Sequence, residues 1–136
     1  MRLYNIHLQS LGILPSVDFL QSSGTERIKK KISSGFVQQE DQIAEVLKHK
    51  NSSPYPVVLA GDFNNTSFSY IYRKLKKDMN DAFLEKGNGV GRTFSFVSYP
   101  MRIDYILTDP KFEVVKFHTL DETFSDHYPI CTQLGW

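Results

Sequence analysis

Six polar residues in this chain stand at the ends of apolar stretches or interrupt them, where side chains can converge on a ligand. They are His7, Asp62, Asn64, Asp104, Asp126 and His127. Carboxylate and amide oxygens are the ligands that Mg²⁺ and Mn²⁺ prefer. A histidine that is oriented by a carboxylate can carry a proton during hydrolysis. These residue types therefore suit metal-assisted hydrolysis, provided that the fold brings them together.

The motif GDFN, residues 61–64, directly follows the apolar run VVLA. Strand ends in α/β sheets are rigid positions from which polar groups can converge on a ligand. Gly-Asp and Asn-Asn are also ordinary turn chemistry at a strand end. The motif alone therefore fits either a turn or the edge of a site. His7 and the pair Asp126-His127 likewise fit simple structural roles when each is taken alone.

Asp104 lies among apolar neighbours in the stretch MRIDYILTD. A carboxylate is costly to bury without a partner. We therefore expect a cation or a histidine beside it.

The first half of the chain alternates between strand-like and helix-like segments. Residues 3–8, LYNIHL, alternate as a strand with one apolar face. Residues 36–50 predict a helix with the stripe Phe36, Ile43, Ala44 and Leu47, and residues 57–60 predict a strand that is apolar on both faces. Between the first two segments, residues 9–34 are polar and carry the basic cluster RIKKKI, which fits a short helix or a loop with a solvated face.

The second half predicts one more helix and several short strands. Residues 67–77 place Phe68, Ile71, Tyr72 and Leu75 at helical spacing, with Ser67 as the N-cap. The segments RTFSF, RIDYILTD, FEVVKF and YPICTQL then predict strands. The GNGVG stretch lacks the lysine and the following helix of a phosphate-binding loop, so it is interpreted as a turn. The pattern indicates an α/β fold with helices on one face of a mixed sheet.

Composition limits the possible classes of protein. The chain has 136 residues, 40% of them hydrophobic, which is enough for one domain with a core. A net charge of +1 gives no overall field that favours nucleic acid or a membrane surface. The single cysteine, Cys131, is expected to be a buried thiol. No apolar run reaches the roughly 18 residues of a membrane span, and the first residues do not form a signal peptide, so the chain as given is expected to be soluble.

Taken together, the motifs resemble those of the endonuclease/exonuclease/phosphatase superfamily, the metal-dependent phosphoesterases related to DNase I. The resemblance rests on N-x-H in the first strand, GDFN after an apolar strand, R-I-D-Y, and S-D-H before the last strand, in that order along nearly the whole chain. It implies a fold that is half of a DNase I-like four-layer α/β sandwich. Residues 1–136 would be the C-terminal part of the family domain, with the N-terminal half missing.

The resemblance also implies roles for the first three of these residues. His7 would contact the scissile phosphate and could act as an acid. Asp62 would orient or deprotonate the attacking water. Asn64 would hold a phosphate oxygen or a metal-bound water.

For the remaining three residues, the resemblance implies a catalytic pair and a metal ligand. Asp104 would pair with His127, and His127 would act as a base or stabilise the pentacovalent phosphorane. Asp126 would bind the metal, Mg²⁺ or Mn²⁺, together with Asp62 and Asn64. The main metal ligand of the family is a glutamate upstream of the first strand seen here. We therefore expect weak metal binding and weak activity from the isolated chain.

Two classes of function stay open at this point. One is a metal-dependent phosphoesterase acting on nucleic acid, a lipid headgroup or an inositol phosphate, and the other is a non-catalytic half-domain that serves as an interaction module. The basic residues of the 9–34 segment could contact phosphates of any of these substrates. Because the partner sheet of the family sandwich would be missing, we expect one apolar face of the sheet to be uncovered. Such a face predicts a homodimer. The compartment is unknown, since a full-length protein could be secreted or membrane-anchored.

Overall fold

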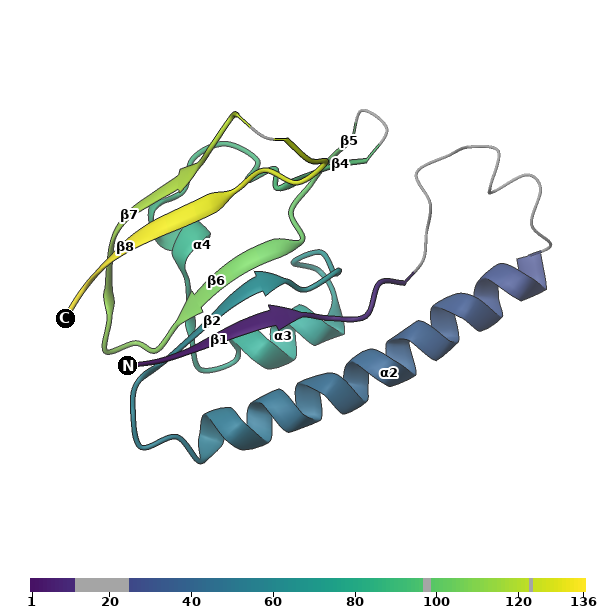
Figure 1. Ribbon diagram of the computed structural model, residues 1–136, viewed down its shortest axis with the longest axis horizontal. Coiled ribbons are helices and arrows are strands. Elements are labelled where there is room, and N and C mark those ends of the chain that lie inside the picture. Colours follow the sequence, from purple (N-terminus) through teal and green to yellow (C-terminus); the bar gives the residue numbers. More distant parts are fainter. Residues whose placement is uncertain (12–24, 97–98, 123) are drawn as a thin grey trace.

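The computed structural model describes residues 1–11, 25–96, 99–122 and 124–136 (Figure 1). In this part of the chain, four strands form a sheet in the order β1–β2–β6–β3: β1 (Arg2–His7), β2 (Val57–Asp62), β6 (Asp104–Thr108) and β3 (Asn80–Asp81). β1 runs parallel to β2, whereas β6 is antiparallel to both β2 and β3. The predicted mixed sheet is confirmed.

Two helices cover one face of this sheet: α2 (Thr25–Asn51) and α3 (Tyr70–Lys76). Ile43 of α2 and Leu75 of α3 pack in one core cluster with Ile6 and Leu59 of the strands, and Ile43, Leu59 and Leu75 are at most 1% exposed. The prediction of helices on one face is therefore also confirmed. In Figure 1, α2 runs along this side of the sheet and extends beyond the carboxyl ends of β1 and β2.

Helix α2 is longer than the sequence predicted, and it buries a different stripe. Phe36 is 41% exposed and Ala44 is also exposed, whereas Gln39 is fully buried. The Gln39 amide donates a hydrogen bond to the Gln9 carbonyl (2.6 Å) and accepts one from Asn65 (2.9 Å). This polar pairing satisfies a group that would otherwise be costly to bury. The basic cluster lies in the first turns of α2, and residues 12–24 of the expected irregular segment lie outside the described residues.

Helix α3 begins later than predicted because its N-cap is Ser69 and not Ser67. The Ser69 hydroxyl accepts a hydrogen bond from the Tyr72 backbone N–H (3.0 Å). Phe68 therefore precedes the helix and is 85% exposed, while Ile71 and Tyr72 are buried as expected.

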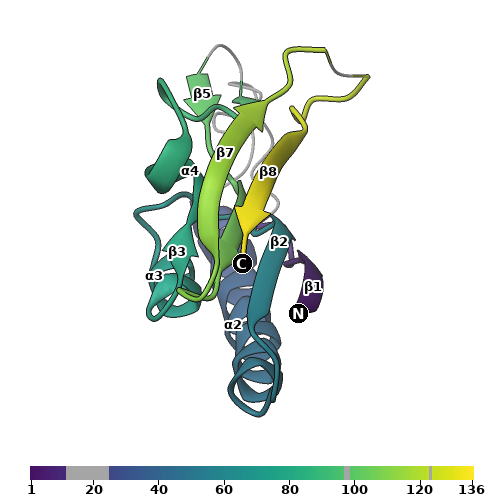
Figure 2. The same ribbon diagram turned by 90° about the vertical axis from the view of Figure 1, so that its left-hand side faces the viewer.

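A second layer lies over part of the opposite sheet face, as Figure 2 shows. It consists of the antiparallel pair β7 (Glu113–Thr119) and β8 (Ile130–Gly135), together with the short helix α4 (Ala82–Lys86). Half-buried Ile130 and Leu134 of β8 pack on a cluster formed by Ala82, Val114 and Phe117. Cys131, which alternates with these residues, is exposed, so the prediction of a buried thiol is wrong.

The elements β7, β8 and α4 therefore cover part of the sheet face opposite α2 and α3, which was expected to be uncovered. Leu3 of β1 is still 61% exposed and Trp136 is 85% exposed. A cavity of about 670 Å³ lies between this face and the segment before β8, lined by Asn5, Ala60 and Phe124 among others.

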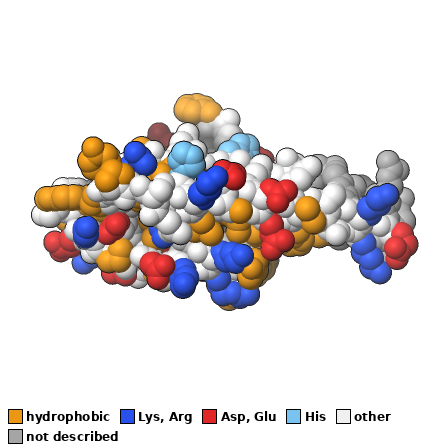
Figure 3. Space-filling view, turned by 90° about the horizontal axis from the view of Figure 1, so that it is seen from below, with side chains coloured by type: hydrophobic (Ala, Val, Ile, Leu, Met, Phe, Trp, Pro, Cys, Tyr) orange, Lys and Arg blue, Asp and Glu red, His pale blue; other side chains and the backbone are white. Residues whose placement is uncertain are grey.

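Charged side chains of both signs are mixed over the molecular surface seen in Figure 3. This mixture agrees with the net charge of +1. Among the described residues, no helix combines the length and the apolar character that crossing a membrane requires.

Candidate active site

Strand register places three of the six candidate residues side by side. His7, the last residue of β1, is the partner of Asp62, the last residue of β2. Asp62 is in turn the partner of Asp104, the first residue of the antiparallel strand β6. The three side chains therefore come from the ends of three neighbouring strands, on the same side of the sheet where β1 and β2 end.

Gly61 allows β1 and β2 to approach closely just before Asp62. Its φ of +135° is a conformation that L side chains rarely adopt, and a Cβ at this position would overlap the carbonyl oxygen of Ile6. The glycine of GDFN is thus required by the backbone, and it fixes Asp62 relative to β1.

The Asp62 carboxylate is held on one side and open on the other. One oxygen accepts a hydrogen bond from the Asn64 backbone N–H (2.7 Å), which forms an Asx turn. The other oxygen, Oδ2, lies 3.7 Å from His7 Nε2 and 4.0 Å from His127 Nε2. Two imidazoles therefore face the same carboxylate oxygen at more than hydrogen-bond distance.

His127 forms the partner that Asp104 was expected to need. Its Nδ1 lies 2.9 Å from Asp104 Oδ2, and the side chains of Asp104 and His127 are only 17% and 32% exposed. Because a carboxylate can only accept, Nδ1 donates this bond when Asp104 is ionised, and Nε2 is the ring nitrogen on the Asp62 side. The ring also packs on Phe94 of β4 (Phe94–Phe96), with 4.8 Å between ring centroids.

Thr93, which the sequence analysis missed, ties the segments of Asp104 and His127 together. Its buried hydroxyl accepts hydrogen bonds from the backbone N–H groups of Ile103 and Asp104, both at 3.0 Å. Its carbonyl accepts a third bond from the N–H of Tyr128 (2.8 Å). A threonine at a strand entrance carries no distinctive sequence signal, so only the structure reveals this role.

The two remaining candidates, Asn64 and Asp126, lie in the same cavity as Asp62 and His127. This cavity has a volume of about 610 Å³, and His7 also lines it. The Asn64 side-chain amide donates to the Leu8 carbonyl (2.9 Å), which ties the GDFN turn to the end of β1. Five of the six candidates thus meet in one cavity, and Asp104 contacts it through His127.

Three side chains offer ligand atoms that could hold a divalent metal. Within the described residues, oxygen or nitrogen atoms of Asp62, Asp104 and His127 lie within 4.8 Å of one another. Of the predicted ligands, Asp62 is in this group, and Asn64 and Asp126 line the same cavity as Asp62. Mg²⁺ commonly binds one or two carboxylates and keeps several waters, so these residues fit such an ion. Because Asp104 and His127 already bond to each other, few ligand atoms remain for a metal ion. We therefore expect the chain to bind Mg²⁺ weakly.

Burial raises the pKa of Asp62 above its ordinary value of 3.8. The hydrogen bond from the Asn64 N–H opposes this shift, and the nearby charge of Asp104 adds to it. Between 3.8 and the raised value, the native state binds more protons than the unfolded chain. The stability contribution of Asp62 therefore falls as pH rises through this window.

We accordingly expect Asp62→Asn to be more stable than wild type at neutral pH in EDTA, because the variant removes a buried charge. The difference should shrink as pH falls from the raised pKa of Asp62 towards 3.8 and should be lost below 3.8. Urea unfolding over a pH series measures it, with Asp41→Asn on the exposed side of α2 as the control. A wild-type protein that is the more stable of the two at neutral pH would contradict this expectation.

Comparison with known proteins identifies the family. The model of the Endonuclease/Exonuclease/phosphatase family matches residues 33–127, which is more than half of the chain. The chain therefore belongs to the endonuclease/exonuclease/phosphatase family. No curated protein sequence matches it significantly.

Solved structures share the fold at low sequence identity. The 3′ phosphatase NExo from Neisseria, bound to a product DNA hairpin, has a TM-score of 0.70 at 16% identity, over 98% of this chain and 61% of its own. A functionally unknown conserved protein from Enterococcus faecalis has a TM-score of 0.68 at 18% identity, over 98% and 49%. A mannosyl-6-phosphatase from Bacteroides thetaiotaomicron has a TM-score of 0.56 at 22% identity, over 73% of this chain and 45% of its own. The chain thus spans 45% to 61% of the length of these proteins.

Proposed function

We propose that this chain carries catalytic residues of a metal-dependent phosphoester hydrolase. The observation that supports this most is the row His7, Asp62 and Asp104 on neighbouring strands, completed by His127 at 2.9 Å from Asp104. Hydrolysis of a phosphoester needs a positioned water, a proton carrier and groups that bind the phosphoryl oxygens. Family membership and the neighbouring phosphatases support the same reaction class.

In this proposal, the proton is moved by the pair Asp104 and His127. The Asp104 carboxylate fixes the orientation of the imidazole and stabilises its charged form, so that Nε2 can exchange a proton on the Asp62 side. Asp62 orients the attacking water through its Oδ2. His7, whose side chain is 77% exposed, is accessible to the phosphate.

Mg²⁺ or Mn²⁺ would be held chiefly by Asp62, with Asn64 and Asp126 within the same cavity as further ligands. The ion would neutralise charge on the phosphoryl oxygens. The carboxylates and the amide of the cavity fit this chemistry because hard divalent cations prefer oxygen ligands.

Hydrolysis of bis-p-nitrophenyl phosphate at high protein concentration tests the proposal. We expect slow release of p-nitrophenol that requires Mn²⁺ and falls to the EDTA rate in Asp62→Asn. General acid–base catalysis typically contributes about 10²–10⁴-fold, so His127→Ala should also fall close to that rate. Asp41→Asn should keep the wild-type rate. Equal release by wild type and Asp62→Asn would contradict the proposal.

The alternative is an interaction module, and it makes a separate prediction of assembly. Exposed Leu3 and the cavity of about 670 Å³ on the β1–β2 face support self-association through that face. We propose a two-fold dimer that buries at least about 1,200 Å² in total. Sedimentation at micromolar concentration should show a dimer that Leu3→Glu converts to monomer. A wild-type monomer under these conditions would contradict the proposed dimer and leave the catalytic proposal intact.

A further inference from the structure

The cavity that holds His7, Asp62 and His127 has a second, apolar part. Five side chains from different elements form it, and we call them the apolar wall: Leu11, Phe36, Phe94, Met101 and Ile103. Phe36 comes from α2, Phe94 from β4 and Met101 from β5 (Tyr99–Met101). Because Phe94 packs directly on the His127 ring, the apolar wall begins beside the proposed proton carrier.

The side chains that the structure describes in this cavity include no strongly basic group. Among the described residues that line it, none is lysine or arginine, and the only groups that can be cationic are His7 and His127. The sequence has no lysine or arginine at residues 12–24, 97–98 or 123 either. On α2, the nearest lysines whose side chains the structure describes, Lys29 and Lys30, precede Phe36 by about 9–10 Å along the helix axis. The Lys29 ammonium group lies 3.4 Å from Glu26 Oε1.

The apolar wall and the lack of described lysine and arginine side chains in the cavity both affect which substrate the site can bind. A substrate with several phosphates would place additional negative charge beside Asp62 and Asp126, and none of the described lining residues is a lysine or arginine that could neutralise it. An apolar group beside the phosphate would instead be removed from water by the apolar wall. A cavity of about 610 Å³ is within the range of pockets that enclose small organic ligands.

Building on the proposed function, we propose that this site takes a phosphoester with a single phosphate and an apolar or aromatic organic group. It would discriminate against polyphosphorylated sugars. The phosphate lies at the polar end formed by His7, Asp62 and His127, and the organic group lies against Phe36 and Met101. Such a group could come from a nucleoside-like or a lipid-like source, which share this chemistry.

Binding in Mg²⁺ buffer, followed by calorimetry, tests the inference without requiring turnover. The probes are methyl phosphate, phenyl phosphate, hexyl phosphate and inositol trisphosphate. We expect phenyl or hexyl phosphate to bind at least about tenfold more tightly than methyl phosphate, as burial of a small apolar group typically gives. Preference for phenyl over hexyl phosphate would indicate a nucleoside-like source, and the reverse a lipid-like one.

Variants locate the preference in the structure. Phe36→Ala should reduce the ratio of phenyl to methyl phosphate affinity to within about threefold, because a wall residue that is 41% exposed is lost. Met101→Ala provides a second wall variant if Phe36→Ala unfolds. Phe68→Ala, which removes an 85% exposed ring outside the cavity, should leave the ratio unchanged.

Three results would overturn the inference. Equal affinity for methyl, phenyl and hexyl phosphate would refute it while leaving the proposed function standing, and so would tighter binding of inositol trisphosphate. If none of the four probes binds, the inference and the proposed function both fail.

Discussion

Arg102→Met is expected to lower the free energy of unfolding by about 3–5 kcal/mol, the usual cost of breaking a buried ion pair. The Arg102 guanidinium lies 2.6 Å from Asp81 Oδ2, and the two side chains are 10% and 1% exposed. Without Arg102, the buried Asp81 charge would keep two donors among the described residues, the Tyr72 hydroxyl (2.7 Å) and the Phe83 N–H (3.0 Å). Because Arg102 directly precedes Ile103 and Asp104, we also expect the start of β6 to loosen.

Urea unfolding of the single and double variants measures this effect. Adding Asp81→Asn to Arg102→Met should recover part of the lost stability, because asparagine keeps an acceptor for the Phe83 N–H and removes the charge. A loss below about 1 kcal/mol in Arg102→Met would show that this pair is solvated as surface pairs are.

Thr93→Val is expected to cost about 2–6 kcal/mol, because one buried and one partly buried backbone N–H group would lose their acceptor at about 1–3 kcal/mol each. These are the N–H groups of Ile103 and Asp104, which bond the Thr93 hydroxyl at 3.0 Å. The variant should also weaken the contact between Asp104 and His127, since Thr93 holds both segments.

Thr93→Ser is the matched control, because serine keeps the hydroxyl. We expect it to retain both the stability and the downfield Nδ1–H resonance of His127, whereas Thr93→Val should lose or broaden that resonance. Identical spectra for the valine and serine variants would mean that Thr93 does not position the pair.

Sequence patterns predicted the parts of the fold that depend on local rules. The alternation of residues 3–8 corresponds to β1, since period-2 burial follows from strand geometry. The apolar run before GDFN corresponds to β2, whose first three residues are all buried because both faces of the strand are covered. Helix ends were less predictable. Ser67 and Ser69 are equally good caps by residue type, and only the bond from the Tyr72 N–H to the Ser69 hydroxyl distinguishes them.

Burial and side-chain alignment depended on contacts between residues distant in sequence, which sequence patterns do not show. Gln39 is polar and was left out of the predicted apolar stripe, yet it is buried because Gln9 and Asn65, distant in sequence, bond its amide. Cys131 was expected to be buried, but it lies on the outward side of β8. The candidate residues His7, Asp62 and Asp104 were recognisable by type and motif, but their alignment depends on strand register. Their catalytic roles stay predictions.

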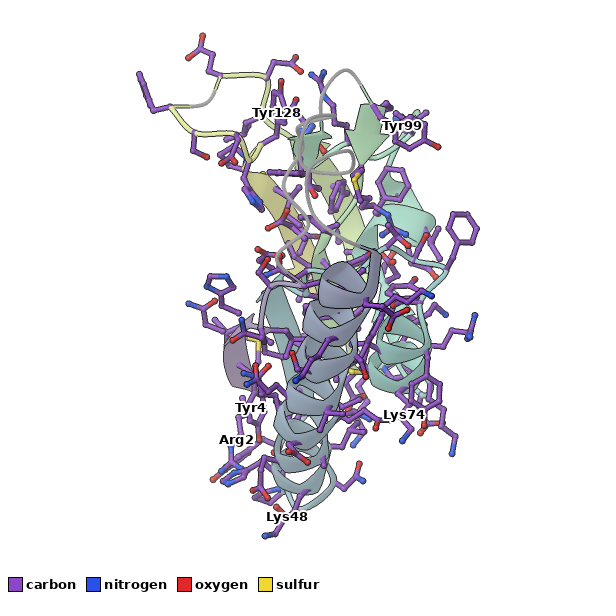
Figure 4. All side chains as sticks on the ribbon, turned by 90° about the vertical axis from the view of Figure 1, so that its right-hand side faces the viewer. Arg2, Tyr4, Lys48, Lys74, Tyr99 and Tyr128 are labelled. Atoms are coloured by element: carbon purple, nitrogen blue, oxygen red, sulfur yellow. The ribbon has the colours of Figure 1, made fainter. Side chains whose placement is uncertain are left out.

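The position of a bound metal ion tests the central claim that Asp62 and His127 mark the functional centre. Mn²⁺ broadens nuclear magnetic resonance signals of nearby nuclei, and the chain has four histidines as reporters. His127 is next to Tyr128, whereas His49 is next to Lys48, and Figure 4 shows Tyr128 and Lys48 at opposite ends of the molecule.

At substoichiometric Mn²⁺, we expect the imidazole signals of His7 and His127 to broaden first and the His49 signals to stay sharp. Excess Mg²⁺ should restore the signals. Asp62→Asn should abolish the selective broadening, and Asp41→Asn should preserve it. Broadening of His49 before His7 and His127, or selective broadening that persists in Asp62→Asn, would show that Asp62 and His127 do not mark the metal site.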